Sequence, residues 1–175
     1  MQKVMFVDRN NKDALLVAQL ADSRWDRVLV FTQMKHVANK VAKKLAGAGI
    51  NAAVIHGNKS QGARTEALAS FKDGRVRVLV ATDIAARGLD VDGISHVINY
   101  DLPVEPEVYI HRIGRTARAG AGGDAITFCS AGERDFLRAI EKLIRTNVPV
   151  DSRHAFHSEA ASRATGADAR PAPKE

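Results

Sequence analysis

The sequence predicts an α/β domain in which helices cover both faces of an open, mostly parallel sheet. Six short runs of β-branched and aliphatic residues occur within residues 1–145, and most are separated by segments with helical spacing of apolar side chains. Continuous apolar runs are typical of strands buried on both faces, as in parallel sheets. Strands that alternate with helices form repeated βαβ units. Ligands bind such sheets beyond the carboxyl ends of the strands, so we expect the functional residues there.

Each expected element has its own local signal. Apolar spacing predicts helices at 15–20, 37–45, 63–71 and 136–144. Ser60 is a suitable N-cap for the third helix, and Ser130 and Glu133 have the spacing of a capping box before the last. Residues 47–52 match a dinucleotide-binding pattern, but they lead from a helix into a strand, so we interpret them as a glycine-stopped helix end. The expected strands are Val4–Val7, Val28–Thr32, Ala52–His56, Val76–Ala81, His96–Tyr100 and Ala125–Cys129.

Length and composition limit the class of protein. The chain has 175 residues, of which 45% are hydrophobic and 26% charged, which suits one globular domain with at most an appendage. No stretch approaches the ~18 consecutive apolar residues of a membrane span, and no secretory signal is visible. The single cysteine, Cys129, cannot form an internal disulfide. These features predict a cytoplasmic protein without a membrane partner, and the net charge of +6 favours a polyanionic one.

The C-terminal segment differs from the rest in composition. Residues 151–175 carry four basic and four acidic side chains and one large apolar side chain, Phe156, so all of the net charge lies on residues 1–150. So little apolar surface cannot offset the conformational entropy lost on ordering. We therefore predict a globular domain over residues 1–148 and a flexible extension or truncated linker over residues 149–175. Deleting that extension should change the melting temperature little.

Residues 111–120 contain three arginines at intervals of three residues, namely Arg112, Arg115 and Arg118. On a helix or tight turn this spacing brings guanidinium groups to neighbouring positions, where they repel one another. A multiply anionic ligand such as nucleotide phosphate would favour the cluster. Three solvated arginines at a helix end remain the alternative.

Two further segments carry polar residues at expected strand ends. Thr82, Asp83, Arg87 and Asp90 follow a buried strand, where a hydroxyl suits a phosphate, a carboxylate suits a ribose, and Gly88 permits close backbone approach. A capped turn in which Asp83 starts a short helix explains only Thr82 and Asp83. Residues 55–64 place Lys59, Gln61 and Arg64 at a helix N-terminus, a position that attracts a phosphate backbone.

In this order, the three segments resemble the second half of the motif set of DEAD-box RNA helicases. The resemblance runs from about residue 3 to 145, and the opening QKVMFVDR and IHGNKSQGAR resemble the bacterial RhlE-like subgroup in particular. A chromatin-remodelling lobe is expected to have a glutamine-led sixth motif, and His111 argues against it. The matching segments are VLVFTQMK (28–35) for motif IV, Gln61-x-x-Arg64 for IVa, VLVATDIAARGLD (78–90) for V, HVINYDLP (96–103) for Va and HRIGRTARAG (111–120) for VI.

The resemblance implies a RecA-like C-terminal lobe that pairs with an N-terminal lobe of the same protein. That other lobe carries the Q motif, the Walker A sequence and the Asp-Glu-Ala-Asp box, and no G-x-x-x-x-G-K-[ST] occurs in this chain. ATP and single-stranded RNA, or a short duplex, would bind across the cleft between the lobes. The other lobe would hold most of the ATP and the Mg²⁺, and this chain has no expected metal ligand. We expect the isolated chain to be a monomer without ATPase activity.

The resemblance also implies roles for individual residues. The implied catalytic residues are Arg115, Arg118 and His111. The residues implied to contact ATP are Gly88, Asp90, Arg115 and Arg118. Those implied to contact the RNA backbone are Gly57, Arg64 and Thr82. Close relatives often have a threonine at position 34 that touches an RNA phosphate, and Met34 puts that contact in doubt. A non-catalytic RNA-binding or protein-docking module, or a DNA helicase lobe of the same superfamily, remain alternatives.

Overall fold

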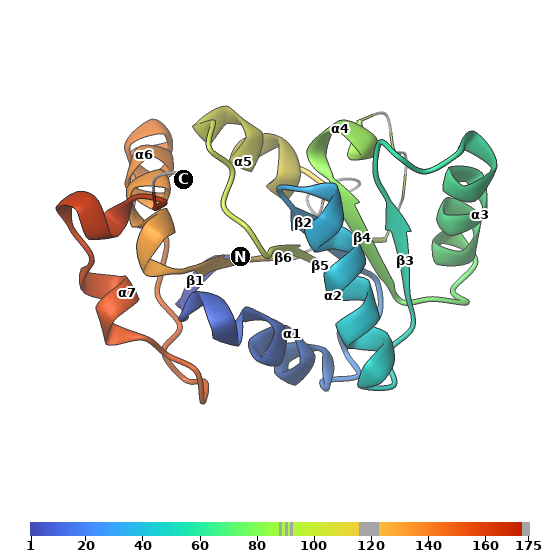
Figure 1. Cartoon of the computed structure of the whole chain (residues 1–175), viewed down its shortest axis with the longest axis horizontal. Coiled ribbons are helices and arrows are strands. Elements are labelled where there is room, and N and C mark those ends of the chain that lie inside the picture. Colours follow the sequence, from blue (N-terminus) through green and yellow to red (C-terminus); the bar gives the residue numbers. More distant parts are fainter. Residues whose placement is uncertain (88, 90, 92, 116–122, 173–175) are drawn as a thin grey trace.

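The central sheet contains six parallel strands in the order β1-β6-β5-β2-β4-β3 (Figure 1). The structure is a computed structural model that describes residues 1–172 apart from 88, 90, 92 and 116–122. Each expected strand is confirmed, with ends that move by at most two residues. The strands are β1 (Gln2–Phe6), β2 (Val28–Thr32), β3 (Ala52–Ile55), β4 (Val78–Thr82), β5 (His96–Asn99) and β6 (Asp124–Cys129).

Helices connect and cover the strands. The four expected helices correspond to α1, α2, α3 and α6. The short α4 begins at Asp83, as the capped-turn alternative proposed. Neither α5 nor α7 was predicted as an element from the sequence. The helices are α1 (Lys12–Leu20), α2 (Lys35–Gly47), α3 (Gln61–Lys72), α4 (Asp83–Ala86), α5 (Pro106–Ile113), α6 (Arg134–Ile144) and α7 (Glu159–Arg163), with 3-10 turns η1 (Arg9–Asn11), η3 (Ala131–Glu133) and η4 (Gly166–Ala169).

The two faces of the sheet are covered by different helices. Val28 and Val30 of β2 pack with the apolar residues of α1 and α2, whereas the alternate residues Leu29 and Phe31 pack with those of α3 and α4. At the β1 end of this second face, α5, α6 and α7 cover the sheet (Figure 1). Both faces of a central strand are therefore buried, which explains why its sequence shows no polar alternation.

The predicted caps are present. The Ser60 side chain accepts a hydrogen bond from Ala63 N at 3.1 Å and so caps α3. Ser130 and Glu133 form a capping box, although it opens η3 immediately before α6. Gly49 has a φ of +81° just after α2, which confirms the glycine-stopped helix end. None of the helices in the described part of the chain is long and apolar enough to cross a membrane.

The C-terminal segment differs from the expected flexible extension, because it first lies along the outer edge of β1 and then packs against η3 and α6. Val4 N donates to Pro149 O at 2.8 Å, and Asp151 N donates to Val4 O at 2.9 Å. Further on, Ala161 is fully buried in the core under α5 and α6. The composition was misleading because small alanines and backbone groups make these contacts, not large apolar side chains.

Side chains of α6 hold the end of this segment. Arg138 Nη2 donates to Ala164 O at 2.6 Å, and Arg134 Nε donates to Ser162 O at 3.0 Å. An edge strand otherwise exposes a row of unpaired backbone groups. The segment therefore covers the free edge of β1.

Candidate nucleotide and RNA interface

Polar side chains gather where the parallel strands end. Thr32 of β2 is in register with Thr82 of β4, and Ile55 of β3 is in register with Ala81 of β4. The loops that follow these strands therefore begin side by side at one edge of the sheet, together with α4. The α5 helix reaches the same edge from β5 (Figure 1). The sequence segments that were expected to act together are thus brought together.

Arg112 of α5 is a buried anchor that joins three of these segments. Its Nε donates to Asp83 Oδ1 at 2.6 Å and its Nη2 donates to Asp83 Oδ2 at 2.7 Å, a bidentate ion pair. Its Nη1 donates to Asn99 Oδ1 at 3.1 Å and to Asp101 O at 2.6 Å. The guanidinium also lies over the ring of Phe31, 5.1 Å from its centroid.

Because Arg112 is only 1% exposed, these contacts position the start of α4 and the end of β5 relative to α5. A buried arginine is stable only when its donors are satisfied. Asn99 is itself fixed by donating from Nδ2 to Thr127 Oγ1 at 3.0 Å. Arg112 is therefore not available to an external phosphate.

This finding corrects the expectation of one cluster of three neighbouring guanidinium groups. Arg112 points into the protein, whereas Arg115 lies past the end of α5 and is half-buried. The reason is the ion pair that Arg112 makes with Asp83, whereas the acceptors of Arg115 among the described residues are the backbone carbonyls of Leu89 and Ala86. Arg118 lies outside the described residues.

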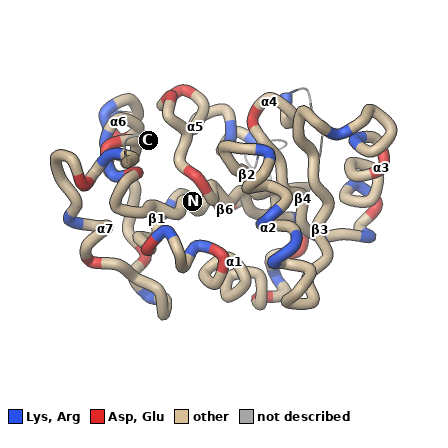
Figure 2. The backbone as a smooth tube through the Cα atoms, in the orientation of Figure 1, with Lys and Arg blue, Asp and Glu red and all other residues tan. Residues whose placement is uncertain are grey.

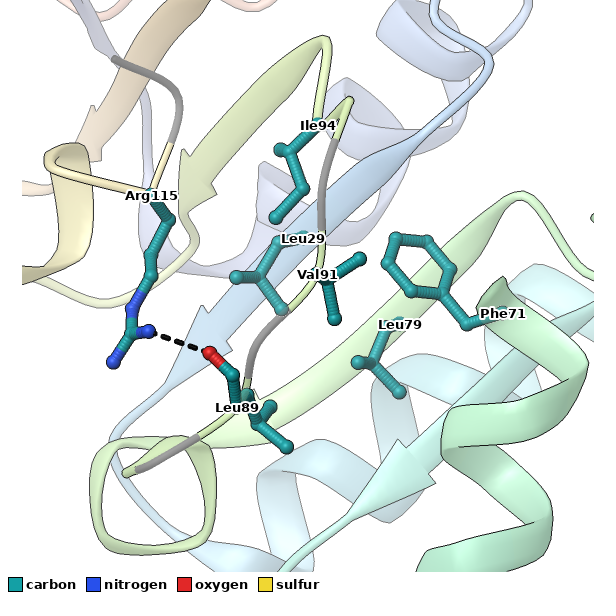
Figure 3. Close-up of a pocket in the computed structure, with 7 residues that line it drawn as sticks. All are labelled: Leu29, Phe71, Leu79, Leu89, Val91, Ile94 and Arg115. Carbon is teal, nitrogen blue, oxygen red and sulfur yellow. Dashed lines mark hydrogen bonds between the residues drawn. The ribbon is translucent and has the colours of Figure 1, made fainter. Parts of the chain in front are cut away.

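Arg115 rests on the loop that follows α4 (Figure 3). Its Nη1 donates to Leu89 O at 2.8 Å and its Nη2 approaches Ala86 O at 3.4 Å. Its side chain closes one end of a cavity of about 10 Å³, which holds about one water and no nucleotide. Both of these acceptors are neutral carbonyl oxygens, so neither of them neutralises the guanidinium. The apolar lining residues are Leu29, Phe71, Leu79, Leu89, Val91 and Ile94.

Of the other residues implied to act in catalysis or to contact ATP, the structure describes only some. His111 lies exposed on α5 next to Arg112, and it makes no hydrogen bond to any residue that the structure describes. Gly88 and Asp90 are outside the described residues. Of this segment, the structure describes Leu89, whose backbone carbonyl accepts the hydrogen bond from Arg115.

The three residues implied to contact RNA lie around the adjoining ends of β3 and β4. Thr82 is the last residue of β4 and the N-cap position of α4, and its side chain makes no capping hydrogen bond. Gly57 is exposed just beyond β3, and a Cβ there would meet no atom within 4 Å. Arg64 of α3 donates from Nη2 to Ala85 O at 3.1 Å, which holds its guanidinium against α4.

The loop that carries Gly57 is also tied to α2, a connection that the sequence did not reveal. Lys35 Nζ donates to Asn58 Oδ1 at 2.9 Å, and the ring of His56 hydrogen-bonds Asn39 Oδ1 at 3.1 Å. Burial lowers the pKa of His56, and the nearby charges of Lys59 and Lys35 lower it further. Neutral His56 accepts from Asn58 N through Nδ1 at 3.1 Å, which shapes the turn.

Met34 is the N-cap residue of α2 and is 47% exposed, without a side-chain cap.

Sequence reasoning also missed Asp101, whose carboxylate accepts from Gln33 N at 3.0 Å and from Lys12 Nζ at 3.2 Å. The pKa of buried Lys12 is raised by Glu133 and Asp101 together, against the effect of burial. No local pattern marks such pairs, since their partners lie 68 and 89 residues apart in the chain.

Comparisons with known proteins agree on one family. Residues 11–120 match the model of the helicase conserved C-terminal domain. The ATP-dependent RNA helicase RhlB of Pseudomonas syringae pv. tomato is 41% identical over 151 residues, which cover 86% of this chain. These residues are 38% of that relative's length, so the chain corresponds to less than half of it. The RhlE-like subgroup stays a prediction.

Solved structures show the same architecture. The E. coli DEAD-box protein SrmB, crystallised with regulator of ribonuclease activity A, superimposes with a TM-score of 0.84 at 36% identity, and the match covers 99% of this chain and 96% of that one. S. cerevisiae Dbp5 bound to RNA and ADP BeF3 gives 0.80 at 30% identity, over 87% of this chain and 41% of that one. The chain therefore belongs to the helicase conserved C-terminal domain family and has the RecA-like fold of DEAD-box C-terminal lobes.

Proposed function

We propose that this chain is the C-terminal lobe of an ATP-dependent RNA helicase, and that it supplies arginine fingers for ATP hydrolysis and part of a groove for the RNA backbone. The observation that carries the proposal is the gathering of Gly57, Arg64, Thr82 and Arg115 around one edge of the sheet, next to α4. In open α/β sheets this edge is where ligands bind.

The RNA groove follows from the chemistry of its residues. Thr82 offers a hydroxyl, Arg64 a guanidinium, and Gly57 a backbone that an approaching phosphate meets without a side chain. These groups bind phosphate oxygens and carry no base-reading pattern, so recognition is blind to sequence and weakens with salt. The Dbp5 structure with RNA and ADP BeF3 supports this role by relationship.

Arg115 is the proposed finger that the structure describes, and Arg118 is its proposed partner. During phosphoryl transfer, negative charge spreads over the oxygens of the transferred group, and a guanidinium fork matches that geometry. The two carbonyls that hold Arg115 are neutral, so phosphate oxygens would replace them as stronger acceptors when the lobes close. His111, exposed on the same helix, is proposed to touch the acidic box of the other lobe.

The nucleotide would lie mainly on the N-terminal lobe, with Gly88 and Asp90 contacting it from this side. In the described part of the chain, no group of three His, Cys, Asp or Glu side chains could hold a metal ion. We propose that the other lobe binds the Mg²⁺, as the family resemblance implies. By itself, the chain is proposed to be a cytoplasmic monomer without ATPase activity.

The experiment compares nucleic acids as activators of a protein in which this chain follows its N-terminal lobe. We expect RNA to stimulate ATP hydrolysis strongly and DNA of the same sequence to stimulate it little. Stimulation by DNA alone would indicate a DNA helicase lobe. RNA binding without any hydrolysis would indicate a non-catalytic binding module.

A further inference from the structure

The exposed face of α2 is strongly basic. The helix contains four lysines and no acidic residue, and its sequence KHVANKVAKKLAG places the apolar Ala38, Val41 and Leu45 against the sheet. The lysines occupy exposed positions around the opposite side, and they recur along the length of α2 in Figure 2. They are Lys35, Lys40, Lys43 and Lys44.

Little of this charge is neutralised within the protein. Lys40 Nζ lies 3.6 Å from Asp13 Oδ2, but its side chain is 58% exposed, so the pair contributes little. Lys43 and Lys44 form no ion pair with any residue between 1 and 172 that the structure describes. Four like charges within about two and a half turns repel one another, and a polyanion that lies along the helix would relieve that repulsion.

The position of α2 indicates which polyanion fits. Its first turn is joined to the Gly57 loop through Lys35 and Asn58, and through Asn39 and His56. From there the helix runs away from the proposed RNA groove. Lys35 and Lys44 are ~13 Å apart along the axis at 1.5 Å per residue, a length of about four nucleotides at 3.4 Å each.

We propose that the lysines of α2 form a second RNA-backbone contact, in which a strand that leaves the groove at Gly57 continues along this helix. The inference rests on the proposed function, because it takes the groove as the place where the RNA enters. Lys40, Lys43 and Lys44 bind phosphates as flexible point charges, so this contact adds affinity and length to the footprint without base specificity.

The test uses the chain as it stands, with fluorescently labelled hexauridylate and dodecauridylate in anisotropy titrations at several salt concentrations. The double variant Lys43→Gln/Lys44→Gln removes both lysines without an ion pair, and glutamine keeps the helix stable. The matched control is Lys142→Gln/Arg145→Gln, which removes two exposed charges from the end of α6, far from α2. Thermal melts of each variant confirm that folding is retained.

We expect the double variant to bind dodecauridylate several-fold more weakly than the control does, and to bind hexauridylate equally well. For a single strand, each lost phosphate contact lowers the slope of log affinity against log salt by ~0.7, so the slope should fall by about 1.4. The inference would be overturned if the double variant bound dodecauridylate with the same affinity and the same salt slope as the control. The basic face of α2 would then be suited to an acidic protein instead.

Arg64→Ala distinguishes a failure of this inference from a failure of the proposed groove. Because Arg64 lies in the groove, its loss should weaken hexauridylate and dodecauridylate alike. If Arg64→Ala changes neither affinity, the groove is wrong, whatever the lysines do. If Arg64→Ala weakens both and the double variant matches the control, only the α2 contact is wrong.

Discussion

Arg112 and Arg115 lie three residues apart, yet the structure assigns them different tasks, and substituting each with alanine should separate stability from catalysis. Arg112 is 1% exposed and makes a bidentate ion pair with Asp83. Arg115 is half-buried, and its hydrogen-bond acceptors among the described residues are two backbone carbonyls. We therefore expect Arg112→Ala to destabilise the fold strongly and Arg115→Ala to destabilise it much less.

The expected loss in the free energy of unfolding depends on the groups that each substitution leaves without a partner. Arg112→Ala strips Asp83 of its partner, and breaking a buried ion pair costs about 3–5 kcal/mol. Asp83 is 30% exposed, so water partly replaces the lost guanidinium and the low end, about 3 kcal/mol, is expected. For a chain of this length that corresponds to a melting temperature lower by ~6–12 °C. Arg115→Ala removes neutral-acceptor hydrogen bonds and should cost about 1 kcal/mol.

Urea unfolding followed by circular dichroism measures both values in this chain. A double-mutant cycle with Asp83→Asn tests the cause, because the two losses should not add when the residues act as a pair. Arg112→Lys should recover only part of the loss, since an ammonium lacks the fork. The reasoning fails if Arg112→Ala and Arg115→Ala cost the same, or if Arg112→Ala and Asp83→Asn are additive.

Three further predictions concern the stability of the fold. Deleting residues 149–175 should lower the melting temperature by several degrees, because the deletion exposes the β1 edge and the space that Ala161 fills. An unchanged melting temperature in a thermal scan would show that the segment is the flexible extension predicted from the sequence. Hydrogen bonds from Arg153 N and Lys3 Nζ lower the pKa of Asp151 from 3.8 to about 2. Ionised Asp151 therefore stabilises the folded state above about pH 4, and this contribution is lost as the pH falls from about 4 to 2. In urea titrations over that range, the stability gap between the parent and Asp151→Asn should close, and a constant gap would contradict the assignment. Met34→Thr should give α2 a side-chain cap, stabilise the protein by about 1 kcal/mol and bind oligouridylate somewhat more tightly. A less stable variant would show that the packing of the Met34 side chain contributes more than the cap.

The sheet could be predicted because its signals are local. Strands such as β2 and β4 are continuous apolar runs, and Ser60 caps α3 with its own side chain three residues away. The α5 helix was not predicted because it has only eight residues and its buried face includes the charged Arg112 beside Tyr109. The α7 helix was not predicted because alanines, not large apolar side chains, fill its contact with the core.

The site could be predicted in its location but not in its connections. Thr82 and Arg64 come together because parallel strands end at one edge, a consequence of the fold class. The Arg112–Asp83 pair joins residues 29 apart in the chain, and spacing alone made Arg112 look like a member of one phosphate-facing cluster. Which of the arginines pairs with the Asp83 carboxylate depends on tertiary packing, and a single sequence does not show it.

The most direct test of the central claim is single-turnover ATP hydrolysis, with saturating RNA and magnesium, by a protein in which this chain follows its N-terminal lobe. Arg115→Ala and Arg118→Ala should each slow hydrolysis steeply, by a factor on the order of 10³–10⁵ if they act as arginine fingers do elsewhere. ATP affinity of the open enzyme should change much less, and Arg115→Lys should not restore the rate. If both alanine variants hydrolyse ATP at close to the parent rate, the arginine-finger role is wrong.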